Sequence, residues 1–251
     1  FCHHFHDDLP GTSLMVVYMR AWNDLLMSLS QFSAEYESAI GRMASALDIS
    51  FVGDGLAVAV CDPYIGDSPV ERAVTVNCAG LSGPVRVFDG DGKALPSQHD
   101  GEEITFLCAA PPAGAAVFGV EKADAEAPAE RRVTVTENSL ENEYLRVSVD
   151  RRGDVCSIFD KRAGCETLAA PIRHALFDYD GNEDYPAWEL TYDEVSRAPA
   201  CYAVADRVEI LRDGPVRCSL KITKKLRSSS LTEVISLDAG ARVLDYKCEL
   251  D

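Results

Sequence analysis

Apolar residues recur every three or four positions near the start of the chain. The series runs Leu14, Val17, Ala21, Leu25, Leu29, Phe32, Tyr36, Ile40, Met43 and Leu47. This spacing places the side chains on one face of a helix of about nine or ten turns over residues 12–47. Pro10 and Gly11 punctuate the preceding turn, and Thr12 or Ser13 can cap the first turn. Because the stripe is long and apolar, we expect the helix to pack in a bundle with partners encoded upstream.

The period changes from about 3.6 to 2 after Ile49. Short β-prone runs cover residues 56–60, 73–76, 84–88, 103–107 and 116–120, separated by Gly, Pro and Asp. The sequence Asp89-Gly90-Asp91-Gly92 is a strong turn signal between two of these strands. The pattern predicts a small β-sandwich-like domain over residues 49–123, following a bundle remnant at 1–48. The acidic, aromatic-free stretch at 124–132 reads as a linker.

Alternation of apolar and polar residues continues to the end of the chain. Runs at 133–136, 145–149 and 155–159 are followed by others near 204–211, 216–222, 231–237 and 243–250, and Arg152-Gly153-Asp154 reads as a hairpin turn. Many antiparallel strands without intervening helices predict a large β-sandwich over residues 133–251. The last run ends at Asp251 without punctuation, so we expect this domain to be truncated. The fold class is therefore mainly β with an N-terminal α-helical segment.

Charge and cysteine content restrict the partners and the compartment. Lys and Arg number 24 against 41 Asp and Glu, a net charge of −17, which disfavours binding to nucleic acid or to anionic membranes. The sequence shows no export signal and no apolar run of the roughly 18 residues that a membrane span needs. Nine scattered cysteines without a Cys-x-x-Cys pair predict reduced thiols, most of them small buried core residues, in a cytoplasmic protein.

The one dense group of potential metal ligands is Cys2-His3-His4-Phe5-His6-Asp7-Asp8. Imidazole and carboxylate ligands suit zinc and related divalent ions, but a catalytic site needs three or four such ligands and an open position. This segment offers only part of a shell. By spacing alone, an exposed polar tip or the remnant of an affinity tag is the favoured interpretation.

Three stretches, read in order, are similar to a known family. The first, Phe5-His6-Asp7-Asp8-Leu9-Pro10-Gly11-Thr12-Ser13, resembles a motif of the glycoside hydrolase family 38 α-mannosidases. The second joins Glu141-Asn142-Glu143-Tyr144-Leu145-Arg146-Val147 to Asp160-Lys161-Arg162-Ala163-Gly164, and the third is Gly214-Pro215-Val216-Arg217. The resemblance implies that His6 is a metal ligand and Asp7 binds the sugar, with His4 in packing or hydrogen bonding around them.

A further segment, Asn182-Glu183-Asp184-Tyr185-Pro186-Ala187-Trp188-Glu189, resembles an Asp-Ala-Trp-Asp segment of the family, with Glu189 where Asp is common. Trp188, with Asp184 beside it, could form a sugar-stacking platform, or the ring could be a lid over the sandwich. For the motifs of residues 137–166 a structural role is the alternative: Asn and Gly form turns, Asp160 and Lys161 pair at a strand end, and the apolar residues form the core.

The resemblance implies a metal-dependent retaining α-mannosidase that removes terminal α-linked mannose from oligosaccharides or glycans, with a galactose-mutarotase-like large β-domain. Such enzymes use two carboxylates about 5 to 5.5 Å apart. In this family they come from an N-terminal barrel that nothing here matches, so we expect no catalytic residue in this fragment, which alone would be inactive. The expected metal is zinc, with cobalt or calcium as alternatives, and a homo-oligomer is compatible with the sequence. The rival interpretation is a non-catalytic carbohydrate-binding or structural β-sandwich module.

Overall fold

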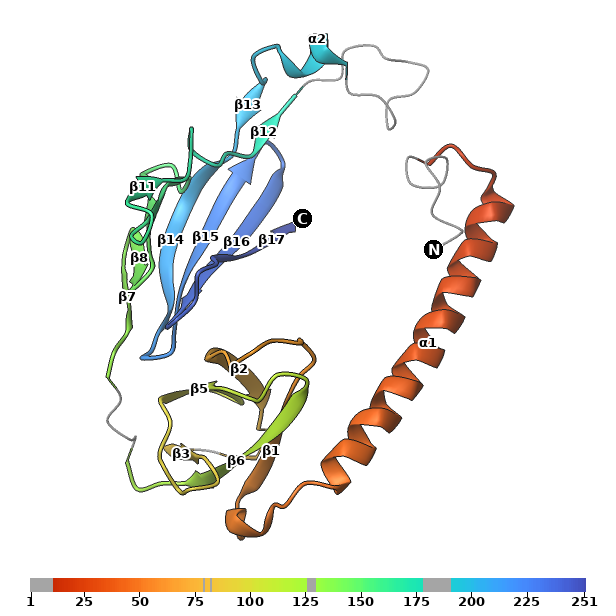
Figure 1. Ribbon diagram of the computed structural model, residues 1–251. Helices are drawn as coiled ribbons and strands as arrows, with labels where there is room; N and C mark the ends of the chain where they lie inside the picture. Colours follow the sequence, from red (N-terminus) through yellow and green to blue (C-terminus); the bar gives the residue numbers. More distant parts are fainter. Residues whose placement is uncertain (1–10, 79, 82, 126–129, 178–190) are drawn as a thin grey trace. The chain divides into compact units, whose positions relative to one another are not determined.

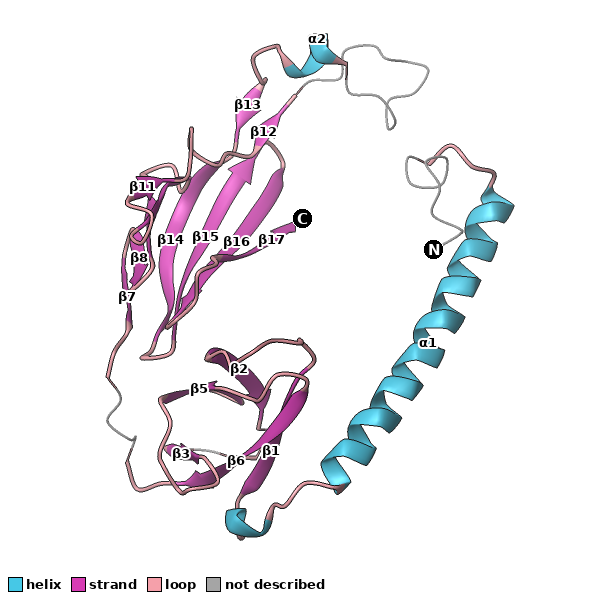
Figure 2. Cartoon of the chain, viewed as in Figure 1, coloured by secondary structure: helices cyan, strands magenta, loops and turns pink. Residues whose placement is uncertain are grey.

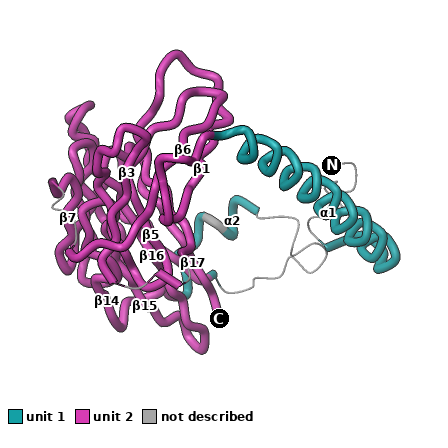
Figure 3. The backbone as a smooth tube through the Cα atoms, turned by 90° about the horizontal axis from the view of Figure 1, so that it is seen from below, with its two compact units in different colours: residues 1–47, 177–200 teal, residues 48–176, 201–251 magenta. Residues whose placement is uncertain are grey.

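A computed structural model describes residues 11–251 except 79, 82, 126–129 and 178–190. The chain divides into two compact units (Figure 3). One comprises Phe1–Leu47 and Phe177–Ala200, and the other comprises Asp48–Leu176 and Cys201–Asp251. The second unit contains both β-rich regions predicted from the sequence.

The N-terminal helix α1 spans Met15–Ser45. It is shorter than predicted, and the expected cap at Thr12 or Ser13 is wrong because Leu14 occupies the N-cap position without a side-chain capping bond. Among the described residues the helix buries Ala21, whereas Phe32 is 75% exposed and Trp22 is 65% exposed. The apolar stripe is therefore present as predicted, and its packing in a bundle stays a prediction.

The small β-domain is a sandwich of two three-stranded antiparallel sheets. A short 3-10 turn, η1 (Ser50–Val52), leads into the sheet β1-β6-β3, whose strands are β1 (Leu56–Asp62), β3 (Val85–Phe88) and β6 (Gly114–Lys122); the sheet β2-β5-β4 contains β2 (Arg72–Asn77), β4 (Ser97–Asp100) and β5 (Glu103–Cys108). Between the two sheets lies an apolar core that includes Val87, Ile104, Phe106 and Val120, all fully buried. This burial supplies the main stabilisation of a sandwich of this size.

The large β-domain begins with a five-stranded sheet in the order β11-β10-β9-β8-β7, of which β7, β8 and β11 are labelled in Figure 1. Its strands are β7 (Val133–Thr136), β8 (Ser139–Asn142), β9 (Leu145–Val149), β10 (Val155–Asp160) and β11 (Cys165–Glu166). The hairpin predicted between β9 and β10 is present, with Gly153 at φ +77°. That φ lies in the left-handed region, which glycine adopts without a Cβ clash.

Four long antiparallel strands form the second sheet of this domain, in the order β14-β15-β16-β17. They are β14 (Val204–Asp213), β15 (Arg217–Leu226), β16 (Ser229–Asp238) and β17 (Asp245–Leu250). One apolar cluster joins the two sheets, with Leu140 and Val147 from the first and Leu220, Ile222 and Ile235 from the second, all fully buried. The predicted large antiparallel sandwich is therefore confirmed, as is the mainly β fold class (Figure 2).

Three short elements connect the sheets. Strands β12 (Ala175–Leu176) and β13 (Cys201–Tyr202) pair with each other, and α2 (Tyr192–Val195) lies between them in sequence. Thr191 and Glu194 form a capping box at the start of α2, which satisfies two backbone N–H groups that a helix start leaves without partners.

The prediction of free thiols is correct for the described cysteines, whereas the prediction that most of them are buried is not. The eight cysteines that the structure describes are all free thiols. Only Cys78, Cys108 and Cys218 among them are buried, and Cys165 and Cys248 are exposed. The interpretation that most cysteines are small core residues is therefore wrong for the described part of the chain. In that part, neither helix has the length and apolar character needed to cross a lipid bilayer.

Candidate functional site

The residues predicted from the family resemblance to contact metal or sugar lie outside the described residues. These are His6, Asp7, Asp184 and Trp188, together with His4. Within the described ranges, no three His, Cys, Asp or Glu side chains come together in a group that could hold a metal ion. The metal and sugar assignments therefore stay predictions, and the polar groups that the structure describes consist of other residues.

Asn142 of the "ENEYLRV" motif is a buried junction between the two sheets of the large domain. Its Nδ2 donates to the carbonyls of Asp238 at 2.7 Å and Ala241 at 2.8 Å, and its Oδ1 accepts from the backbone N–H groups of Tyr144 and Leu145, each at 2.8 Å. Both donor hydrogens and both acceptor sites are thus used, which is what makes an amide tolerable in a core. The structural interpretation of this motif as a turn is correct.

The "DKRAG" motif forms a turn that differs in one detail from the prediction. Asp160 Oδ1 accepts from the backbone N–H groups of Arg162 and Ala163, at 2.8 and 2.9 Å. Lys161 pairs instead with Glu141, at 2.7 Å, and donates to the carbonyl of Asn142. The predicted Asp160–Lys161 pair is therefore wrong, because an Asp at the first position of a turn satisfies backbone donors better than it pairs with its neighbour.

Glu166 closes the same turn. Its Oε1 accepts from the N–H groups of Ile158 (2.9 Å), Thr167 (2.9 Å) and Leu168 (3.0 Å), and its Oε2 accepts from the hydroxyl of Ser157 at 2.5 Å. These hydrogen bonds, the Ser157 hydroxyl first, lower the pKa of Glu166 from 4.5 to about 2. The carboxylate acts as a turn clamp rather than as a proton donor.

The Gly214-Pro215-Val216-Arg217 motif is where the small β-domain meets the large one. Gln98 of β4 extends its Oε1 to the N–H groups of Val216 (3.1 Å) and Arg217 (2.7 Å). A Cβ on Gly214 would lie 2.1 Å from that oxygen, so any other residue would displace the Gln98 amide from these N–H groups. Arg217 forms two bonds with Asp238, at 2.6 and 2.8 Å. The motif is thus an interdomain contact.

Three charged side chains are buried together at one end of the large core. Lys224 Nζ lies 2.9 Å from Asp154 Oδ1 and 3.1 Å from Glu233 Oε1, and all three side chains are 1% exposed. Lys224 continues the inward-facing row of Leu220 and Ile222 on β15. Removal of such charges from water is costly, so the group is stable only because opposite charges meet within it.

Further groups continue this cluster toward the surface. Arg173 Nε is 3.3 Å from Asp154 Oδ2, and His174 Nδ1 is 2.8 Å from Glu233 Oε1. Tyr246 stacks on His174, with ring centroids 6.3 Å apart, and its phenol lies beside the Glu233 carboxylate. Burial and the nearby Glu233 carboxylate raise the pKa of this Tyr246 phenol well above its ordinary value. Cys248 Sγ lies 4.0 Å from His174 Nε2. We refer to these seven residues as the Glu233 cluster, namely Asp154, Arg173, His174, Lys224, Glu233, Tyr246 and Cys248.

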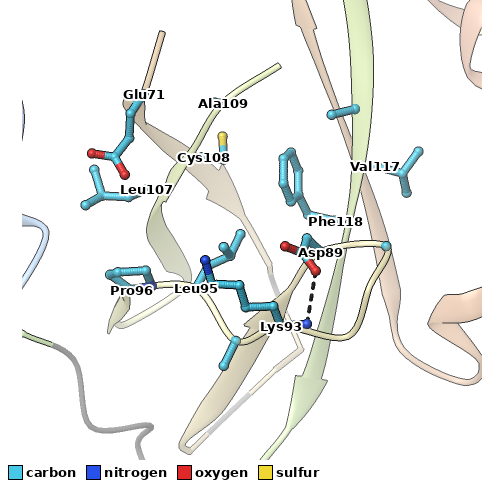
Figure 4. A pocket seen from close by; sticks show the side chains of 13 residues that line it. Glu71, Asp89, Lys93, Leu95, Pro96, Leu107, Cys108, Ala109, Val117 and Phe118 are labelled. Atoms are coloured by element: carbon cyan, nitrogen blue, oxygen red, sulfur yellow. Dashed lines mark hydrogen bonds between the residues drawn. The ribbon is translucent and has the colours of Figure 1, made fainter. Parts of the chain in front are cut away.

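A cavity of about 590 Å³ lies in the small β-domain (Figure 4). Its lining includes the charged residues Glu71, Asp89 and Lys93, with the Lys93 N–H bonded to Asp89 Oδ1 at 3.0 Å, and the apolar residues Leu107 and Phe118. Phe118, the aromatic residue in this lining, is 4% exposed. It cannot offer an open ring face to a sugar, so the cavity gives no support to the carbohydrate-binding module.

Sequence reasoning missed the Glu233 cluster entirely. One signal was available, because Lys224 and Glu233 stand at inward positions of strands whose other inward residues are apolar. A charged residue in such a row predicts a buried partner. The partners themselves, Asp154 in a turn and His174 in a connection, carry no pattern that would have located them.

Comparison with known proteins agrees with the C-terminal motifs. The family model described as the glycosyl hydrolases family 38 C-terminal domain matches residues 140–251, which cover strands β9 to β17 and most of β8. No curated protein matches the chain. The matched range contains Asn142, Glu166, Arg217 and the whole Glu233 cluster. Residues 140–251, somewhat less than half of the chain, are therefore similar to a family 38 C-terminal domain, and this match supports a relation to the family 38 α-mannosidases.

Proposed function

We propose that this protein belongs to a metal-dependent retaining α-mannosidase that releases terminal α-linked mannose from oligosaccharides or glycans. The observation that carries the proposal is the family match over residues 140–251. The sequence motif at His6 and Asp7 supports it, since an imidazole and a carboxylate at adjacent positions suit a divalent ion and a sugar hydroxyl.

In this proposal the described β-domains support the active site and do not perform the chemistry. The polar side chains of their motifs make structural contacts within these domains. Asn142 uses all its hydrogen-bonding groups, Glu166 holds a turn, and Arg217 binds Asp238. A rigid support of this kind holds substrate-contacting residues in place, which is the requirement for catalysis by positioning. The two catalytic carboxylates would come from a part of the enzyme that the residues described here do not include.

The metal would be held in part by His6, with Asp7 placed to bind a sugar hydroxyl. One imidazole and one carboxylate supply two donors, fewer than the three or four protein ligands of a catalytic zinc site. The remaining donors would have to come from elsewhere. When bound, the ion would polarise sugar hydroxyls; zinc is the expected metal, with cobalt or calcium as alternatives.

The test is hydrolysis of an aryl α-mannoside by the complete gene product, with zinc, cobalt or calcium added after treatment with a chelator. We expect metal-dependent turnover that His6→Ala reduces by at least about 100-fold, because it removes a metal ligand. His99→Ala is the matched control, because it removes the same side chain from β4, outside the motif that contains His6. Absence of metal-dependent turnover, or an equal loss in both variants, would contradict the proposal.

A further inference from the structure

We propose that Cys248 is a thiol-modification site, at which His174 accepts the thiol proton while Glu233 supports the imidazole and the sulfur attacks a small disulfide. The geometry that suggests this is a row of three groups. Cys248 Sγ lies 4.0 Å from His174 Nε2, and the other ring nitrogen, Nδ1, lies 2.8 Å from Glu233 Oε1. A nucleophile, a base and an acid that orients the base are the parts that activate side-chain nucleophiles in proteins.

Strand register places the two outer members of this row on the same face of the sheet. Glu233 of β16 and Cys248 of β17 are directly opposite each other in the antiparallel pair, and opposite residues project to the same side. His174 lies just before β12, where its carbonyl accepts from the N–H of Ala203 at 2.9 Å and Tyr246 stacks on its ring. Two strands and an anchored connection therefore fix the arrangement, rather than flexible side chains alone.

The buried carboxylate of Glu233 favours transfer of the Cys248 thiol proton to His174. The Glu233 side chain is 1% exposed, with Lys224 Nζ at 3.1 Å and His174 Nδ1 at 2.8 Å from Oε1, yet neither of its oxygens makes a hydrogen bond of regular geometry with the described residues. A buried carboxylate in this condition is better compensated by a protonated imidazole than by a neutral one. Transfer of the thiol proton to His174 would create that imidazolium beside it.

The resting thiol is expected to hold its proton. Burial first, and then the negative charge of Glu233, raise the pKa of Cys248, while Lys224 acts in the opposite direction and Glu249 adds a smaller increase. The site is therefore not a preformed thiolate, and its reactivity depends on proton transfer during the attack. The charged groups around this reaction are Asp154, Arg173, Lys224 and Glu233, with Tyr246 beside the imidazole.

In the exchange step, the Cys248 sulfur forms a bond to one sulfur of the reagent and the S–S bond of the reagent breaks. The second half leaves as a thiolate, and the proton of Cys248 passes to His174 Nε2 and then to solvent. The disulfide itself is the oxidant, so the step needs no other reagent. Cys248 is exposed, which gives a small disulfide access to the sulfur.

The experiment measures the reaction of the folded 251-residue chain with 4,4′-dithiodipyridine, a neutral disulfide whose approach the net charge of −17 does not repel. Mass spectrometry of peptides gives separate rates for Cys248 and for Cys165, an exposed thiol on β11 that serves as the internal control. Buried Cys78 monitors folding, because it should stay unmodified in an intact domain.

At neutral pH we expect Cys248 to react at least about 10-fold faster than Cys165. The His174→Asn substitution should abolish that difference without changing the rate of Cys165. Asn keeps a polar group toward Glu233 but places no base at the Nε2 position. In this variant the Cys248 rate should rise tenfold per pH unit, as for an unassisted thiol of raised pKa. Equal rates for the two cysteines in the native chain, or a Cys248 rate unaffected by His174→Asn while Cys78 stays protected, would overturn the proposal.

Discussion

The contact between the two β-domains depends on Gln98, and its removal should have a measurable cost. Gln98 is 9% exposed, and its Oε1 is the acceptor for the backbone N–H groups of Val216 and Arg217. Gln98→Ala leaves both without a protein partner at a junction where Val216 is fully buried. Each buried unsatisfied N–H costs about 1–2 kcal/mol, so we expect the free energy of unfolding to fall by about 2–4 kcal/mol.

Urea unfolding followed by far-UV circular dichroism measures this loss. Fluorescence is unsuitable because both tryptophans, Trp22 and Trp188, lie in the other compact unit. Gln31→Ala, an exposed glutamine on α1, is the matched control and should change stability by less than about 0.5 kcal/mol. A difference between the two variants smaller than that would refute the assigned role of Gln98.

A double-mutant cycle tests the same contact from the other side. Gly214→Ala should be strongly destabilising in the native chain, because its Cβ would lie 2.1 Å from Gln98 Oε1. In the Gln98→Ala background the clash is gone, so the same substitution should cost much less. Equal costs in both backgrounds would show that the close approach of Gly214 to Gln98 is not what requires glycine.

Two other perturbations test the buried charges and the turn clamp. Lys224→Met removes the shared cation of Asp154 and Glu233, both 1% exposed, and should lower the free energy of unfolding by about 3–5 kcal/mol. Adding Glu233→Gln should restore part of that loss. Urea unfolding at neutral pH measures both effects, and a loss below about 1 kcal/mol for Lys224→Met would contradict them. The lowered pKa of Glu166 means that its contribution is fully present above pH 4.5 and is lost as the pH falls toward about 2. The stability difference between the native chain and Glu166→Gln should therefore shrink between pH 5.5 and pH 3, and a difference independent of pH would be evidence against the clamp.

The candidate site was less predictable from sequence than the fold. Family motifs located Asn142, Asp160 and Arg217 but not what these side chains contact, since Asn142 reaches Asp238 and Ala241, almost 100 residues away. Lys161 was assigned the wrong partner because pairing with an adjacent residue is the simplest interpretation of a sequence. Which side chains meet is decided by strand register and sheet packing, and those depend on the whole sandwich.

The sequence by itself determined the local elements. Alternation and turn residues identified the apolar strands, and the predicted bounds of β7 and β9 equal the observed ones. The reason is that alternate residues of a half-buried strand face the core, so the sequence alternates between apolar and polar residues. It missed β4 (Ser97–Asp100) and β8 (Ser139–Asn142), which are polar and exist as strands because they pair with β5 and with β7 and β9. Only the tertiary structure decided that Gln98 joins two domains and that Glu233, His174 and Cys248 form a row. Those contacts join positions far apart in the chain, and no local pattern encodes them.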